Sequence, residues 1–265
     1  MARVITVTIS KGGVGKTTTA VNLAAEFGIH GYRVLLVDMD EQGNATISAT
    51  GKGKEEFANK GVFDMMRAFK ITPPNSFISP SSIPNVDVLP SNPLTNQILN
   101  QLPILKMQYG YAEYMYLSAC LEQMKENYDV IIIDTPPAKN NLTLSALYAA
   151  DDVIIPLKAD KYSMESLSET VTMIETLNRT ENIDINILGI LFTIVEKTAL
   201  MRSLKETLDD SEYKDILFKT EIRKAQAVNE STVYAMPVVI YDAKSNPSLD
   251  YEALYEEIME KEAYR

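Results

Sequence analysis

Apolar and polar positions along the chain follow two spacings, which predict strands and helices in alternation. Runs of consecutive apolar, mostly β-branched residues are typical of buried strands, and apolar residues three or four positions apart are typical of helices. The predicted strands lie at residues 4–9, 34–37, 86–89, 130–133, 153–157 and 185–193. One predicted helix follows the first strand, and others cover residues 62–69, 163–178 and 199–208. Three more are a tyrosine-containing stretch ending near 127, a stretch ending near 234 and a segment that begins near 249.

This alternation predicts the fold class. Repeated strand–helix–strand units place parallel strands side by side and bring helices onto both faces of the sheet. We therefore expect an α/β fold with a mostly parallel, twisted sheet. No shift in composition marks a boundary, so residues 1–265 are expected to form a single domain.

Residues 51–110 follow the alternation least clearly. Residues 52–60 are polar and predict a loop, and four prolines interrupt the stretch that follows. Tyrosines at positions 109, 111, 114 and 116 fall on the next predicted helix. We expect this aromatic stripe to belong to the core rather than to a base-stacking site.

A glycine-rich turn separates the first predicted strand from the first predicted helix. Residues 10–18 read Ser-Lys-Gly-Gly-Val-Gly-Lys-Thr-Thr. Strand, glycine loop and helix in this order form a P-loop, in which backbone N–H groups and the helix N-terminus bind phosphate. Such a loop assigns Lys16 to the β- and γ-phosphates and Thr17 to Mg²⁺. It departs from the usual G-x-x-x-x-G-K-[ST] pattern, because Ser10 replaces the first glycine and Lys11 adds a second lysine.

Carboxylates follow two of the other predicted strands. Asp38 and Asp40 come at the end of the strand at 34–37, and Asp134 ends the strand at 130–133. Ligands of open α/β sheets bind at the carboxyl ends of the strands. Asp134 is therefore expected to hold Mg²⁺, directly or through water, beside the P-loop threonine.

The composition excludes several kinds of site. The net charge is −11, so any contact with nucleic acid has to come from a local basic patch. Cys120 is the single cysteine, which excludes intrachain disulfides and cysteine-rich metal or iron–sulfur centres within one chain. No apolar run approaches the length of a transmembrane helix, and the N-terminal residues predict a strand rather than a signal peptide. We expect a cytoplasmic protein.

Three motifs together resemble the ParA/MinD family of deviant Walker-A ATPases, and most of all its short, Soj-like DNA partition ATPases. The motifs are the loop at 11–18, Asp-x-Asp-x-Gln-Gly-Asn at 38–44 and Asp-Thr-Pro-Pro at 134–137. The stretch at 225–245 is also similar to the C-terminal part of ParA-type proteins. The resemblance covers nearly the whole chain and is weakest at 51–110. It implies a P-loop NTPase fold.

The resemblance implies an ATPase of weak intrinsic activity that binds ATP with Mg²⁺ and forms an ATP-dependent homodimer with two nucleotides at its interface. It implies that Lys11 reaches the partner subunit's phosphates and that Asp40 positions the attacking water. Lys11, Lys16 and Asp40 are thus the expected catalytic residues. The expected nucleotide ligands are Lys11, Gly12, Gly13, Val14, Gly15, Lys16, Thr17, Thr18 and Asp134. The expected metal ligands are Thr17, Asp40 and Asp134.

The resemblance also implies that the ATP-bound dimer binds DNA without sequence preference, associates with the nucleoid and is stimulated to hydrolyse ATP by a ParB-like centromere-binding protein. Residues 196–224 carry seven basic and seven acidic residues, so this segment is neutral in an acidic chain. Phosphate contacts from such a segment would be independent of sequence and sensitive to salt. The expected DNA-binding residues are Lys197, Arg202, Lys205, Arg223 and Lys224.

The sequence departs from the family at three places. Glu41 stands where a proline usually follows the second aspartate, Lys197-Thr198 stands for the usual Arg-Thr, and Arg223 stands where proline is common. The residues of the adenine pocket are accordingly left open.

Other readings of the same nucleotide motifs differ in cargo. A MinD-like protein would bind membrane through a basic amphipathic C-terminal helix, but residues 248–265 hold six acidic and two basic residues, so no membrane contact is expected. An orphan ParA-like positioning ATPase would use the same switch on another cargo. A capsule-type tyrosine kinase would carry a C-terminal tyrosine cluster, of which Tyr251, Tyr255 and Tyr264 are a weak version. A longer ParA would begin with a helix-turn-helix domain, whereas this sequence begins at the P-loop strand, so repression through such a domain is not expected.

Overall fold

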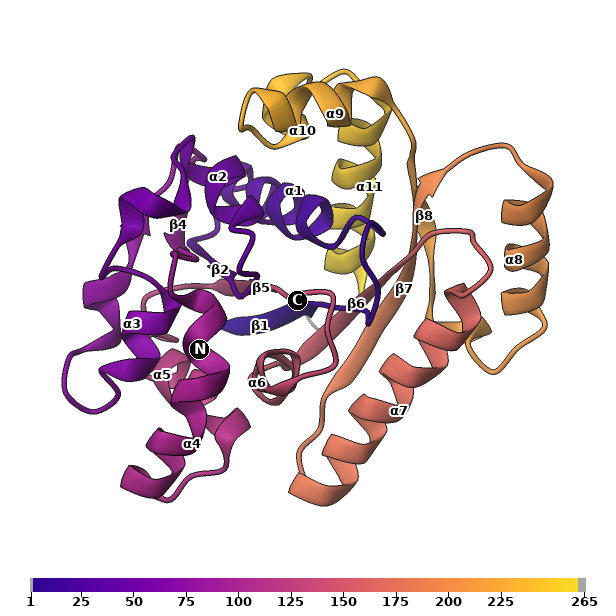
Figure 1. Cartoon of the computed structure of the whole chain (residues 1–265). Coiled ribbons are helices and arrows are strands. Elements are labelled where there is room, and N and C mark those ends of the chain that lie inside the picture. Colours follow the sequence, from indigo (N-terminus) through magenta and orange to yellow (C-terminus); the bar gives the residue numbers. More distant parts are fainter. Residues whose placement is uncertain (1, 262–265) are drawn as a thin grey trace.

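The predicted alternation folds into one eight-stranded sheet in the computed structural model, which describes residues 2–261 (Figure 1). The strands are β1 Arg3–Val7, β2 Val34–Asp38, β3 Ser79–Pro80, β4 Val86–Leu89, β5 Val130–Asp134, β6 Asp152–Leu157, β7 Asn186–Val195 and β8 Leu217–Arg223. Their order in the sheet is β3-β4-β2-β5-β1-β6-β7-β8. Every pairing is parallel except that of the short edge strand β3 with β4. The predicted α/β class and mostly parallel sheet are confirmed.

Helices cover both faces of the sheet. They are α1 Lys16–Ile29, α2 Asn44–Thr50, α3 Val62–Arg67, α4 Ile98–Tyr109, α5 Tyr116–Glu122, α6 Asn141–Tyr148, α7 Ser163–Glu181, α8 Ala199–Asp209, α9 Gln226–Val233, α10 Val238–Tyr241 and α11 Asn246–Glu260. In the view of Figure 1, α1, α2 and α9–α11 lie above the sheet, and α3–α7 lie below it.

Alternate residues of the central strands pack against the helices on opposite faces of the sheet. Ile5 and Val7 of β1 pack in a cluster with α1, α10 and α11, whereas Val4 packs with α3–α6. This is the period of two expected for a strand buried on both faces. A third cluster joins β6 and β7 to α7 and α8. The central strands are therefore fixed from both sides, and their ends form a rigid base for the loops.

The tyrosine-rich helix is one error in the predicted elements. It is two helices, α4 and α5, because Gly110 takes a left-handed conformation (φ 79°) that ends α4. The expected core role holds for Tyr116, which is fully buried, and for Tyr109, which packs edge-on against Phe69, while Tyr111 is 38% exposed. The loop predicted at 52–60 contains a short 3₁₀ helix, η1 Lys54–Phe57.

Among residues 2–261 no helix combines the length and the apolar character that a membrane span needs. Of the three tyrosines considered for a kinase-type cluster, Tyr251 and Tyr255 are buried in α11. Tyr264 lies outside the described residues.

Candidate nucleotide-binding site

The motif residues converge where three central strands end. In the parallel register, Val7 at the end of β1 lies opposite Asp134, and Asp134 lies opposite Asp38 at the end of β2. The glycine loop leaves β1 at this edge and leads into α1. The sheet therefore brings together three motifs that are about 120 residues apart at their extremes.

The loop has the conformation that its glycines predict. Gly13 and Gly15 have φ angles of 70° and 83°, and Gly15 is the N-cap residue of α1. The hydroxyl of Thr193, at the end of β7, donates to the Val14 carbonyl oxygen at 2.8 Å and holds the loop from outside. The N–H groups in the first turn of a helix have no acceptor within the helix, so the start of α1 is suited to bind an anion.

Lys16 lies folded into this site. Its side chain is buried, and Nζ donates to the Lys11 carbonyl oxygen at 2.6 Å. Burial lowers the pKa of the ammonium, while the nearby Asp134 and Asp40 carboxylates raise it. The Lys16 ammonium thus lies near acidic groups, and a phosphate oxygen could take the place of the Lys11 carbonyl oxygen as its acceptor.

Asp134 is the least satisfied polar group of the site. It is fully buried, and neither carboxylate oxygen has a hydrogen bond of ordinary geometry in the described structure. Burial raises its pKa well above the usual range, as does the neighbouring Asp38 charge, while the Thr17 hydroxyl beside it opposes the shift. Buried polar atoms are almost always paired, so these two oxygens are suited to bind a cation.

The donor set limits how such a cation could be held. No group of three or more histidine, cysteine or carboxylate side chains in residues 2–261 has metal-binding geometry. Asp134 and Thr17 supply oxygen ligands, which suit Mg²⁺, an ion that commonly takes one or two protein ligands and completes its shell with water and phosphate. The residues fit a magnesium ion that arrives with a nucleotide.

Asp38 and Asp40 have different tasks. Asp38 is fully buried and accepts hydrogen bonds from the Thr46 hydroxyl (2.7 Å), the Thr46 amide (2.8 Å) and the Asp40 amide (3.1 Å). Burial raises its pKa to about 6, against the effect of these bonds. Among residues 2–261, the Asp40 carboxylate accepts only from the Gln42 amide, at 3.0 Å, on one oxygen. Asp38 fixes the loop, and Asp40 has an oxygen left for another partner.

Lys11 lies in an intrachain ion pair. Its Nζ contacts Asp160, in the loop between β6 and α7. Asp160 also accepts hydrogen bonds from the Tyr162 amide at 2.8 Å and from Ser163 Oγ at 3.2 Å. In the single chain, the extra lysine of the loop is therefore held by the chain's own carboxylate.

A pocket of about 280 Å³ opens beside the P-loop. Its lining combines Gly13, Gly15 and Thr18 of the P-loop region with residues from β7, β8, α9 and α11. The residues outside the P-loop region are Thr193, Ile194, Ile222, Arg223, Lys224, Ala225, Val228, Asn229, Thr232 and Tyr251. Apart from Arg223 and Lys224, which we expected to bind DNA, sequence reasoning gave none of these a site role, because they come from four elements and form no motif.

Ile194 marks this pocket in a second way. It has a φ of 53°, in the left-handed region that β-branched residues rarely adopt. It directly follows Thr193, whose hydroxyl holds the P-loop. Strained backbone of this kind is found most often at functional sites.

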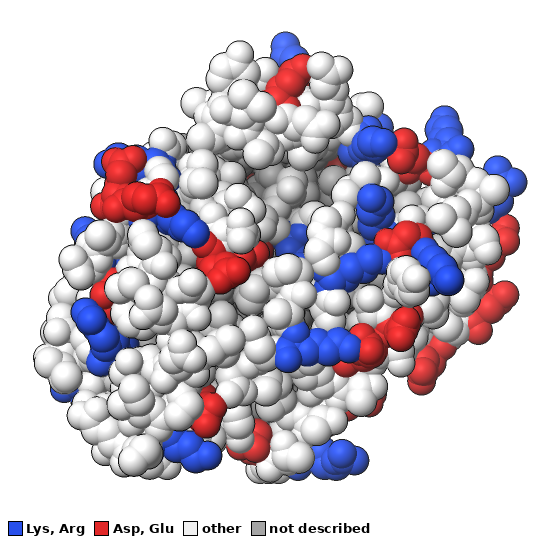
Figure 2. Space-filling view, in the orientation of Figure 1, with Lys and Arg blue, Asp and Glu red and all other residues white. Residues whose placement is uncertain are grey.

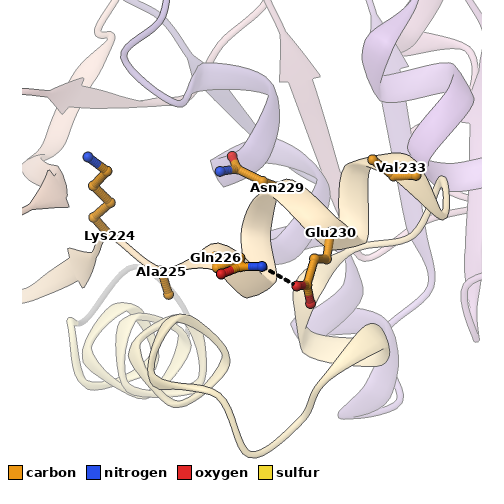
Figure 3. Close-up of a pocket in the computed structure, with 6 residues that line it drawn as sticks. All are labelled: Lys224, Ala225, Gln226, Asn229, Glu230 and Val233. Atoms are coloured by element: carbon orange, nitrogen blue, oxygen red, sulfur yellow. Dashed lines mark hydrogen bonds between the residues drawn. The ribbon is translucent and has the colours of Figure 1, made fainter.

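A wider depression of about 650 Å³ continues along α9 (Figure 3). Gln226 and Glu230 lie against each other along one side of the helix, joined by a hydrogen bond of 2.7 Å, while Asn229 points from another side. Lys224, Ala225 and Asn229 line both this depression and the pocket beside the P-loop. The two spaces are thus parts of one hollow, and the molecular surface is recessed below α9 and α10 (Figure 2).

The expected DNA-binding residues do not form one uniform set. Lys205 forms an ion pair with Glu221, and Lys224 forms one with Glu196 at 3.1 Å. Arg223 forms a bidentate ion pair with Asp250. Lys197 and Arg202 are exposed and have no ion pair among the described residues. On the face shown in Figure 2, acidic and basic side chains are interspersed around α7 and α8.

Comparisons with known proteins agree with this geometry. The family described as an AAA domain (AAA_31) matches residues 2–187. The chain is 34% identical over 260 residues to the sporulation initiation inhibitor protein Soj of Bacillus subtilis, covering 97% of this chain and 98% of Soj. It is 33% identical to the chromosome partitioning protein ParA of Myxococcus xanthus, covering 99% and 89% of the two chains. The structure of cobyrinic acid a,c-diamide synthase from Mycobacterium smegmatis, solved with an ATP analogue and magnesium, superposes with a TM-score of 0.82 at 26% identity, covering 100% of this chain and 98% of that one.

Proposed function

The chain belongs to the ParA/MinD family of P-loop ATPases, and we propose that it is an ATP-dependent DNA partition ATPase acting in plasmid or chromosome segregation. Relatives of about one-third identity over nearly the full chain support an ATPase with a partition role. The finer features below are proposals about this chain.

The observation that carries the proposal is the buried, unpaired carboxylate of Asp134 beside a P-loop. An isolated buried carboxylate is costly, and the cost is recovered when a cation binds. Lys16 and the loop amides offer positive groups for phosphate on one side, and Asp134 with Thr17 offers oxygen ligands on the other. This combination suits a nucleoside triphosphate bound together with Mg²⁺.

The chain's own residues account for hydrolysis mainly by positioning and charge. Phosphoryl transfer requires an aligned water and stabilisation of the charge that develops on the transferred phosphoryl oxygens. We assign the second task to Lys16, Lys11 and the loop amides, and bound Mg²⁺ would add its own positive charge there. Asp40, with an oxygen not used in the loop, would orient the water.

The pocket beside the P-loop is our candidate for the nucleoside. Its apolar lining from Ile222 and Val228 would cover the faces of a base, and the side-chain amide of Asn229 can both donate and accept at its edge. Replacing Asn229 with Ala should therefore lower the affinity for ATP, with a smaller change in how that affinity depends on magnesium.

The ion pair of Lys11 with Asp160 supports a dimer formed only with ATP. A lysine already paired within its own chain needs a stronger anion to leave that pair. The phosphates of a nucleotide bound by a second copy would provide it. We propose that Lys11 moves from Asp160 to the partner's nucleotide when two copies associate.

DNA contact is assigned first to Lys197 and Arg202, since the other expected residues are held by acidic partners. Such contacts would be independent of sequence, and the protein would then associate with the nucleoid in the cytoplasm. A ParB-like centromere-binding protein is the proposed activator of hydrolysis. Both assignments rest on the family and on exposed charge.

One gel-shift series tests the proposal. The full chain is mixed with DNA fragments of unrelated sequence, with ATP, ADP or no nucleotide, over a range of salt. We expect binding with ATP only, weakening steeply as salt rises, and loss of binding in Lys16→Ala. Sedimentation with anionic vesicles is the companion assay, and ATP-dependent binding to vesicles in place of DNA would refute the partition role and favour a MinD-like protein. If ATP and ADP had no effect on DNA binding, the proposal that ATP controls this binding would be refuted.

A further inference from the structure

The loop that carries Asp40 is a tight turn. The Gly43 amide donates to the Asp40 carbonyl oxygen at 3.0 Å, so Asp40 to Gly43 occupy the four positions of a β-turn. The Gln42 amide donates to the Asp40 side chain at 3.0 Å. The orientation of the Asp40 carboxylate therefore depends on the conformation of this turn.

Glu41 occupies the second position of the turn. Proline is favoured there, because its ring fixes φ near the value that the turn requires. Glutamate leaves that dihedral free, and the Glu41 side chain is exposed. The turn is held locally by its own hydrogen bond and by the bond from the Gln42 amide to the Asp40 side chain, whereas φ at position 41 is free unless another segment restrains it.

Lys54, the first residue of η1, contacts the turn at two points. Its Nζ donates to the Glu41 carbonyl oxygen. Its aliphatic stem lies across Gly43, where an added Cβ would come within 3.1 Å of Lys54 Cβ and 3.3 Å of Lys54 Cδ. Lys54 is half-buried, whereas Lys52 and Lys60 on either side are exposed. One side chain thus holds both the second and the fourth residue of the turn.

We propose that Lys54 is a positioning residue for ATP hydrolysis, which fixes the Asp40 turn from outside and replaces the constraint that a proline at position 41 would give. The proposal rests on the proposed function, because it assumes that Asp40 orients the attacking water. Lys54 does not line the nucleotide pocket, and its hydrogen bond and its packing described above are both with the Asp40 turn. Its loss should therefore reduce turnover and leave nucleotide affinity unchanged.

The test uses the full chain with Lys54→Met, which keeps the apolar stem and removes the ammonium. Lys54→Arg is the conservative variant, and Lys52→Met is the exposed control. Steady-state ATPase assays give kcat and KM, and a fluorescent ATP analogue gives affinity. We expect Lys54→Met to lower kcat about tenfold, as for a misplaced catalytic group, with affinity unchanged. Lys54→Arg should recover most of the activity, and Lys52→Met should behave as the parent chain.

A second substitution asks whether the turn itself is responsible. Glu41→Pro added to Lys54→Met should restore turnover, because proline fixes the same dihedral. Amide hydrogen exchange at Gln42 and Gly43 should be faster in Lys54→Met and slow again in the double variant. A merely structural role for Lys54 would lower stability and affinity together, and proline would not restore turnover; that result overturns the proposal.

The two hypotheses fail in different ways. A parent chain that hydrolyses no ATP overturns the proposed function, and the catalytic role of Lys54 with it. An active parent chain with full kcat and unchanged exchange in Lys54→Met overturns the role of Lys54 alone.

Discussion

Replacing Asp134 with Asn should make the ligand-free protein more stable and remove its response to Mg²⁺ and ATP. The Asp134 carboxylate is fully buried, and neither oxygen has a hydrogen bond in the described structure. Its folded-state pKa is raised, so the stability associated with its protonated form is present at low pH and is lost as pH rises. An amide has the same shape and no charge to bury.

The size of the effect follows from the cost of an unpaired buried group. That cost is about 1–3 kcal/mol for a neutral group and more for a charge, while the attraction of Lys16 offsets part of it here. We expect Asp134→Asn to gain about 1–2 kcal/mol above neutral pH, or about 2–8 °C in Tm for a chain of this length. The parent chain should in turn gain about 2.7 kcal/mol from ligand at a hundred times Kd, which the variant loses.

Thermal unfolding in EDTA and in Mg-ATP measures both effects on the same samples. The order of stability should reverse, with the variant above the parent in EDTA and below it in Mg-ATP. Asp152→Asn is the matched control, because Asp152 is equally buried but accepts from Arg3 Nε at 2.5 Å and Asn186 Nδ2 at 2.7 Å. That substitution should be destabilising in both buffers.

Two results would contradict this reasoning. A variant less stable than the parent in EDTA would mean that Asp134 is satisfied in solution. A variant that keeps the full Mg-ATP shift would mean that Asp134 does not hold the cation.

Three further substitutions test other parts of the structure. Burial raises the pKa of Glu26 to about 7, so the stability associated with its protonated carboxyl is lost as pH rises from about 4.5 through 7. Glu26→Gln should remove this pH dependence and add about 2 kcal/mol to the free energy of unfolding at pH 8, as measured by denaturant titration. Gly28→Ala would place a Cβ 2.2 Å from the Pro84 carbonyl oxygen, and we expect a loss of about 3 kcal/mol in urea unfolding; a loss near zero would mean that α1 can shift. Arg223→Ala removes the guanidinium from the half-exposed pair with the buried Asp250, so it should lower the stability in urea unfolding and weaken binding of a fluorescent ATP analogue, whereas an effect on DNA binding alone would return Arg223 to a DNA surface.

The sequence alone predicted the elements that carry strong periodicity. The strand at 86–89 and the helix starts at 163 and 199 are where the apolar pattern placed them, and the strand predicted at 130–133 extends one residue further, to Asp134. The pattern failed around Gly110, because a single left-handed residue ends α4 without changing the apolar spacing on either side. It also missed η1, whose importance lies in one long-range contact.

Local motifs could identify the P-loop and the end of β5 because phosphate and magnesium chemistry requires particular residues at short, fixed spacings. The partners of those residues come from distant segments and obey no spacing. Asp160 holds Lys11, Thr193 holds the P-loop, and Lys54 holds the Asp40 turn. The first two contacts exist because parallel strands bring their ends to one edge of the sheet, and the third depends on how η1 packs back onto the turn after β2. The sequence therefore determined which chemistry the chain can perform, whereas the tertiary structure decided which groups position it, since burial and long-range contacts depend on the packed fold.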